Sequence, residues 1–283
     1  MKRLHPFILL SLLSAAFGAP PLLGRPLSAD AASAVKINIV TFIAENYDFK
    51  GPDRIPAGIT TVRIVNQGDE PHHIQLVKLA KGKTAEDFRK ALKETAVGMP
   101  IWAKNAGGPN GTSPGGQADA TVTLEPGNYL LICVLPNQGG VPHAALGMIK
   151  PLTVAADSSP RPPEPKSDLT LTESDFAFEL SKPVAVGKQT VRVVNNGSQP
   201  HEVVVVRLAP GASIKEFIAA LVPDASGPPP GKLVGGITGI EKGSHGFFDA
   251  NFTPGHYGLI CFFPDAKGRA HFAQGMALEF DVR

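Results

Sequence analysis

The sequence has 283 residues, of which 43% are hydrophobic and 18% are charged. This is a globular composition that can bury cores, and the length suits two domains better than one small sandwich. Three basic residues and one acidic residue lie within the first 34, so the rest of the chain carries 24 of each sign and no net charge. A balanced chain without a basic, aromatic-rich patch argues against nucleic acid as a partner.

The N-terminus has the pattern of a secretory signal peptide. Lys2 and Arg3 precede an apolar stretch from Phe7 to Phe17, and small-residue A-x-A sites follow at 29–31 and 32–34. We therefore predict a signal peptide over residues 1–34 and an exported protein, periplasmic or secreted. The apolar stretch is shorter than the roughly 20 residues of a membrane span. No later stretch is long enough either, so no stable span is expected in the mature chain.

The remaining sequence repeats after about 128 residues. The segment TVRIVNQG at 61–68 matches TVRVVNNG at 190–197, and PGNYLLIC at 126–133 matches PGHYGLIC at 254–261. The repeat predicts a first domain over 35–155 and a second over 169–283. A proline-rich linker over 156–168 is expected between them.

Each half alternates short apolar strand patterns with turn residues, and each contains one helix signal. The strand patterns predict an all-β antiparallel sandwich in each half. Capping-box patterns at Thr84–Asp87 and Ser213–Glu216 predict where the single inserted helix of each half begins. Phe88 and Phe217 each have a leucine four residues later, which is the spacing of one helix face.

Residue types that bind soft metals recur at matched spacing in both halves. A histidine lies ten residues after each cysteine, and a methionine lies five residues after that histidine. With one upstream Pro-His histidine per half, the candidate ligands are His72, Cys133, His143 and Met148, and then His201, Cys261, His271 and Met276. Two imidazoles, one thiolate and a weak axial thioether form the ligand set of electron-transfer copper. We therefore predict copper as the cofactor, with one ion per half.

The first ligand has a neighbour of the same type, His73. In an extended strand, residues two apart share a face, so His72 would point inward together with Ile74 and Leu76. His73 would then point to the opposite face, and its counterpart in the second half is Glu202. We therefore choose His72.

The segment from Asn195 to Val204 resembles the first-ligand segment of plastocyanin-type blue copper proteins, or cupredoxins. The later Tyr-x-x-x-Cys, His and Gly-Met pattern resembles their second ligand segment. The resemblance covers both halves. It implies two tandem Greek-key β-sandwiches with the metal at one end, held by three ligands from one loop and one from a neighbouring strand. One departure is the nine residues between Cys and the second His, where plastocyanins have two. The type 1 domains of copper nitrite reductases have a similarly long loop.

Two cysteines in an exported protein also suggest a Cys133–Cys261 disulfide. That alternative is weaker, because both cysteines end equivalent strands and bridging them would join the same buried end of both domains.

These observations lead to an expectation about function. The sequence has no His-x-His motif and no histidine beside either cysteine, so we expect a non-enzymatic protein and neither a multicopper oxidase nor a nitrite reductase. The leading hypothesis is electron transfer through type 1 copper with a redox partner protein. The alternatives are copper holding or delivery with a copper donor or acceptor, and a copper-free binding or structural module.

Overall fold

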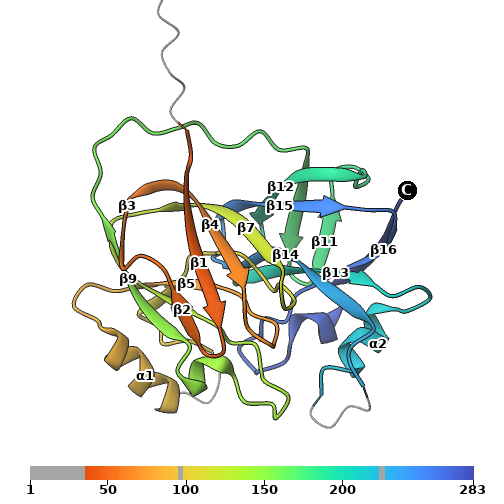
Figure 1. Ribbon diagram of the computed structural model, residues 1–283, viewed down its shortest axis with the longest axis horizontal. Helices are drawn as coiled ribbons and strands as arrows, with labels where there is room; N and C mark the ends of the chain where they lie inside the picture. Colours follow the sequence, from red (N-terminus) through yellow and green to blue (C-terminus); the bar gives the residue numbers. More distant parts are fainter. Residues whose placement is uncertain (1–35, 95–97, 223–226) are drawn as a thin grey trace, which may run out of the picture. The chain divides into compact units, whose positions relative to one another are not determined.

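The computed structural model describes residues 36–94, 98–222 and 227–283, and the predicted signal peptide lies outside them. The described part is built mainly of strands (Figure 1). Those of the first half are β1 (Asn38–Glu45), β2 (Asp48–Lys50), β3 (Arg54–Pro56), β4 (Gly58–Asn66), β5 (Gln75–Leu79), β6 (Ala103–Asn105), β7 (Gln117–Leu124), β8 (Gly127–Ile132) and β9 (Ile149–Ala155). Those of the second half are β10 (Leu169–Ser174), β11 (Ala177–Leu180), β12 (Gly187–Asn195), β13 (His201–Leu208), β14 (Gly231–Ile240), β15 (His245–Phe252), β16 (Gly255–Ile260) and β17 (Ala277–Val282).

One inserted helix lies in each half, as predicted: α1 (Ala85–Glu94) and α2 (Ile214–Ala219). Both begin at the capping boxes. The Thr84 hydroxyl accepts the Asp87 N–H at 3.1 Å, and Ser213 and Glu216 bond each other's main chain in the same way. The expected helical position of Leu221 is wrong, because α2 ends at Ala219 and Leu221 lies beyond it, exposed.

The strands form two β-sandwiches, which confirms the predicted fold class. A five-stranded sheet of order β3-β9-β8-β5-β6 belongs to the first half, and a four-stranded sheet of order β14-β13-β16-β17 belongs to the second. The opposing layer is one sheet of eight strands, β11-β10-β12-β15-β7-β4-β1-β2, to which both halves contribute. The halves join where β15 pairs antiparallel with β7. The repeat in the sequence did not indicate this shared sheet.

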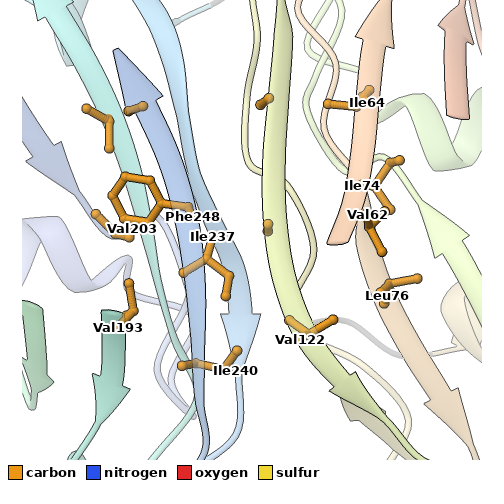
Figure 2. Close-up of a cluster of buried hydrophobic side chains, with 14 of the residues drawn as sticks. Val62, Ile64, Ile74, Leu76, Val122, Val193, Val203, Ile237, Ile240 and Phe248 are labelled. Carbon is orange, nitrogen blue, oxygen red and sulfur yellow. The ribbon is translucent and has the colours of Figure 1, made fainter. Parts of the chain in front are cut away.

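Strand alternation fills the core. In β4, every second residue is buried, so Val62 and Ile64 point inward while their neighbours remain partly exposed. The buried side chains of both halves form one continuous cluster. Figure 2 shows first-half residues such as Ile74 and Val122 in this cluster with second-half residues such as Ile237 and Phe248. The two sandwiches therefore share a core as well as a sheet.

Segment 156–168 connects β9 to β10 and contains no helix or strand. The halves are held together by the shared sheet and core in addition to this connection.

Candidate metal centre

The first site is formed by His72, Cys133 and His143, which come from three places in the first half. Cys133 follows β8, His72 lies just before β5, and His143 begins a short 3-10 helix, His143–Leu146. The Cys133 Sγ lies 3.5 Å from the His143 Nδ1 and 4.0 Å from the His72 Nδ1, and the two Nδ1 atoms are 3.1 Å apart. All three side chains are fully buried.

The second site repeats this arrangement with His201, Cys261 and His271. The Cys261 Sγ lies 3.4 Å from the His271 Nδ1 and 4.0 Å from the His201 Nδ1, and the two Nδ1 atoms are 3.0 Å apart. Both cysteines are free and buried, each within its own half, so the disulfide alternative is not realised.

The three ligand atoms of each site have the spacing that a metal ion requires. A point in the plane of the first-site atoms, whose separations are 3.1, 3.5 and 4.0 Å, lies about 2.1 Å from all three. The second site gives nearly the same value. Metal–imidazole bonds are about 2.0–2.1 Å long and metal–thiolate bonds slightly longer. The residues present therefore fit a copper ion with two imidazole ligands and one thiolate ligand.

Each methionine is tied to its cysteine and histidine through the main chain. The Met148 carbonyl accepts the Cys133 N–H at 3.2 Å, and the Met148 N–H donates to the His143 carbonyl at 3.0 Å. Met276 makes the matching pair of bonds, at 3.2 and 3.1 Å. Both methionine side chains are fully buried. The main chain of each methionine is thus bonded to the cysteine and histidine of its own half, and the role of the two thioethers as ligands stays a prediction.

The long Cys-to-His loop is held by its own hydrogen bonds. In the first half, the Asn137 N–H donates to the Val141 carbonyl at 2.9 Å, and the His143 N–H donates to the Leu135 carbonyl at 2.9 Å. The second-half loop has equivalent bonds, at 2.8 Å in both cases. Because the loop is closed, the nine intervening residues do not leave the second histidine free to swing away.

His72 contributes to the triangle of candidate ligand atoms, and His73 has a different position. The His73 side chain is buried, and its Nε2 accepts the N–H of Val134 at 2.9 Å. It therefore supports the residue after Cys133 without joining the ligand triangle. The glycine before each upstream ligand also has a steric role, because a Cβ on Gly68 would lie 2.7 Å from the His72 Nε2. On Gly197 it would lie 2.4 Å from the matching atom of His201.

Two carboxylates that the sequence reasoning missed contact the ligand imidazoles. In the first half, Glu70 Oε2 lies 3.1 Å from the His143 Nε2, and in the second, Asp175 Oδ1 lies 2.7 Å from the His201 Nε2. A carboxylate at Nε2 fixes the proton there, so the Nδ1 lone pair points into the ligand triangle. Glu70 could have been suspected from its position two residues before His72. Asp175 lies 26 residues before its histidine, so sequence spacing gave no signal.

Burial keeps the ligands neutral in the absence of metal. Burial raises the pKa of the Cys133 thiol to about 12, and it lowers the pKa of His72 and of His271 to about 4 in each case. At neutral pH the site therefore offers two neutral imidazoles and a protonated thiol. Metal binding has to displace the thiol proton, which makes affinity depend on pH.

The second half also buries two carboxyl groups near Cys261. Glu173 is fully buried, and neither of its carboxyl oxygens has a hydrogen-bond partner among the described residues. Burial raises its pKa well above the usual value. Its counterpart in the first half is Ala44. Glu202 stands in the position of His73, and its Oε1 accepts the N–H of Phe262 at 3.2 Å.

Comparisons with known proteins give structural matches only. No family model matches the sequence, and no curated protein matches it. Among solved structures, a dithionite-reduced auracyanin from Roseiflexus castenholzii is 21% identical, with a TM-score of 0.28, covering 40% of this chain and 94% of its own. Auracyanin A, a "blue" copper protein from Chloroflexus aurantiacus, is 22% identical with a TM-score of 0.28, and the match covers 41% of this chain and 99% of that protein. A copper nitrite reductase from Nitrosomonas europaea is 15% identical with a TM-score of 0.26, and the match covers 88% of this chain and 94% of that protein.

The expectation that the chain is not an enzyme is contradicted. Solved structures that align over both halves include the nitrite reductase above and a blue copper oxidase, also from Nitrosomonas europaea, and both are enzymes. The missing His-x-His motif argues only against one arrangement of a second copper centre. It does not argue against catalysis in general.

The two halves of this chain share the sandwich fold, the buried triangle of two Nδ1 atoms and one Sγ, and a methionine bonded through its main chain to the cysteine and histidine. The described chain is a tandem pair of cupredoxin-like sandwiches with two His-Cys-His clusters fitted for copper.

Proposed function

We propose that this protein transfers electrons through type 1 copper, with one ion per half. The ligands proposed are His72, Cys133, His143 and Met148 in the first half and His201, Cys261, His271 and Met276 in the second. The observation that carries this proposal is the preformed triangle of ligand atoms, which has nearly the same dimensions in both halves. Copper bound there would cycle between Cu(I) and Cu(II), since imidazoles suit the oxidised ion and soft sulfur suits the reduced one.

The protein's part in this chemistry is to keep the ligands still. The closed loops hold His143 and His271, and the carboxylates of Glu70 and Asp175 each fix the tautomer of one ligand. A ligand set that does not rearrange suits both oxidation states, so little reorganisation accompanies loss or gain of an electron. Full burial of the three proposed ligands supports retention of the ion over its delivery, and therefore supports electron transfer over copper exchange.

We further propose that the protein acts after export, in the periplasm or as a secreted protein, and exchanges electrons with a partner protein. The support for export is the basic and apolar leader with its small-residue sites. Among the described residues, no helix has the length and apolar character needed to cross a membrane.

Visible absorption and electron paramagnetic resonance of the copper-loaded protein test the proposal. Type 1 sites give an intense blue band from the Cu(II)–thiolate bond, and here two copper ions per chain should be reduced and reoxidised repeatedly without loss of metal. A colourless protein that binds Cu(I) and releases it on oxidation would instead support copper holding or delivery. Failure to bind copper in either state would overturn both.

A further inference from the structure

The two halves meet through equivalent surfaces. Where β7 pairs with β15, Ala120 lies opposite Phe248, and in the neighbouring loop segment Pro109 pairs with Ile237. Both pairs join residues separated by the length of the sequence repeat. Each half therefore presents the same patch to the other, as the subunits of a two-fold symmetric dimer do.

The segments that cross at this axis have matching sequences, GGPNG at 107–111 and GGITG at 235–239. The glycines allow close approach. A Cβ on Gly108 would lie 2.2 Å from the Ile74 carbonyl oxygen, and one on Gly236 would lie 2.0 Å from the Val203 carbonyl oxygen. The two segments also exchange main-chain hydrogen bonds, from Asn110 to Gly236 and from Thr238 to Gly108. By position, Asn110 and Thr238 are counterparts.

Asn110 is fully buried, and its side-chain amide donates into the other half. The Nδ2 atom lies 3.0 Å from Glu202 Oε2, 3.1 Å from the Val203 carbonyl oxygen and 3.2 Å from the Ile237 carbonyl oxygen. Its own Oδ1 accepts the N–H of Gly111. In the described part of the chain, Asn110 is the sole side chain that donates to Glu202.

Glu202 connects this contact to the second site. It follows the ligand His201, and its other oxygen accepts the N–H of Phe262, the residue after Cys261. Glu202 therefore links strand β13, which carries His201, to Phe262, which follows Cys261. A buried carboxyl oxygen without a donor is unfavourable, so we expect loss of the Asn110 amide to shift the Glu202 side chain.

Thr238 makes no reciprocal contact with His73, whereas Asn110 itself lies beside His73: burial lowers the pKa of His73, and the Asn110 side chain opposes this shift. Thr238 donates its hydroxyl hydrogen toward the carbonyl oxygens of Ile74, at 3.0 Å, and Gly108, at 3.2 Å. Both acceptors are main-chain atoms, and the His73 side chain receives no hydrogen bond from Thr238. The duplication is symmetric in its backbone but asymmetric in this side-chain contact.

We infer that the second metal centre is completed by the first half of the chain, with Asn110 as a positioning residue that holds Glu202 and, through it, the N–H beside Cys261. The inference rests on the proposed function for its copper readout. It assigns a role in the second site to the glycine-rich loop after β6, which is otherwise a connection.

The experiment reads the second site alone, in full-length protein carrying Cys133→Ser. Asn110→Asp keeps the shape of the side chain and replaces the amide donor by a second carboxyl group beside Glu202. We expect copper affinity at the second site to fall tenfold or more, as for other groups that orient metal ligands, with a shifted thiolate band. In the double variant that adds Glu202→Gln, the new amide at position 202 can donate to the new carboxylate at position 110, which reverses the direction of the original hydrogen bond. Most of the copper affinity and the original band should then return.

Thr238→Val is the matched control, read at the first site in protein carrying Cys261→Ser. It removes a buried hydrogen bond at the same axis and should lower the melting temperature while leaving the first-site band unchanged. If Asn110→Asp lowers the melting temperature similarly and leaves the second-site band and affinity within twofold of the parent, Asn110 is only structural and the inference is wrong.

A measurement without copper separates this inference from the proposed function. In the metal-free Cys133→Ser protein, the reaction of Cys261 with a thiol reagent reports how firmly the residue is held. Asn110→Asp should speed this reaction tenfold or more, and the double variant should slow it again. An unchanged rate in Asn110→Asp overturns the inference. If the parent Cys133→Ser protein binds no copper but Asn110→Asp still accelerates the reaction, only the proposed function is overturned.

Discussion

The two metal sites have nearly the same ligand triangle but different residues behind it. In the first, Glu70 bonds the histidine that comes from the loop, and the Tyr47 hydroxyl donates to the same carboxylate oxygen at 3.2 Å. In the second, Asp175 bonds the histidine that comes from the strand, and Phe176 stands in the place of Tyr47. The Nε2 of the other histidine of each pair has no partner among the described residues.

The substitutions between the halves are correlated. The first half has Asn46 and Glu70 where the second has Asp175 and Gln199. The carboxylate therefore lies at the second of these positions in the first half, where it contacts the loop histidine, and at the first position in the second half, where it contacts the strand histidine. Burial alone would raise the pKa of Asp175, but hydrogen bonds from Ser198 and His201 outweigh it and lower that pKa to about 2. The comparison shows that the duplication kept the ligands while the surrounding layer diverged. The two sites should therefore differ in potential.

The largest expected effect comes from removing one thiolate. Cys133→Ser should abolish the blue band of the first site and Cys261→Ser that of the second, because the band needs the sulfur. Each variant should retain one copper ion, measured by metal analysis with visible absorption. A variant in which both bands vanish would show that the sites depend on each other for binding, and the comparison of two separate sites would fail.

The second effect concerns Glu173, which replaces the Ala44 of the first half. Burial raises the pKa of Glu173 in the folded protein well above its usual value of about 4.5. The stability that the neutral buried group permits is therefore fully present below about pH 4.5, and the free energy of unfolding falls as the pH rises above that value. Glu173→Gln stays neutral, and its advantage in free energy of unfolding should grow to about 1–3 kcal/mol by pH 8.

Chemical denaturation of the metal-free protein between pH 4 and 8 measures this difference. The wild-type protein at the lowest pH is the internal control, since both side chains are then neutral. A difference that stays constant with pH would mean that Glu173 finds a partner or solvent in the folded protein.

The third expected effect is a weaker Cu(II) affinity at each site when its own carboxylate, Glu70 or Asp175, is replaced. Glu70→Gln should weaken Cu(II) binding at the first site about tenfold and Asp175→Asn should do so at the second, because each removes the charge that strengthens one imidazole ligand. Both changes should raise the reduction potential of their own site, since less electron donation disfavours the oxidised ion. Copper titration in the Cys→Ser protein that silences the other half measures each site alone.

Asn46→Asp sharpens this test. A Cβ on Gly68 would touch both the Asn46 Oδ1 and the His72 Nε2, so these two atoms face the same point. The new carboxylate should accept from His72 as Asp175 does from His201, tighten Cu(II) binding and lower the first-site potential. If the potential instead stays the same, the identity of the residue at this position does not explain the difference between the sites.

The smallest effect on binding is expected from the axial residues. Met148→Leu and Met276→Leu should leave copper bound and the band present, because a thioether in this position is a weak and long ligand. The potential should move in both halves by a similar amount, as measured by redox titration. Loss of copper from only one of the two variants would show that the methionines are not equivalent.

From residue patterns we could predict the repeat, the capping boxes, the strand alternation and the candidate ligands. These features depend on local periodicity or on a spacing of five or ten residues, which a strand end and a short loop preserve. The choice of His72 over His73 follows from strand alternation in the same way, and the structure places His72 in the ligand triangle. Alternation did not show that His73 lies buried beside the site, because both faces of this strand are covered.

The tertiary structure alone decided which distant groups meet. The shared sheet, the Asp175 contact with His201 and the reach of Asn110 to Glu202 join residues 26 to 92 positions apart or strands from different halves. No periodicity encodes such contacts, because they arise only when two sheets and two halves pack against each other. The candidate ligands lie close along the chain or on neighbouring strands, so a sequence pattern can indicate them, whereas the groups that contact them are set by packing.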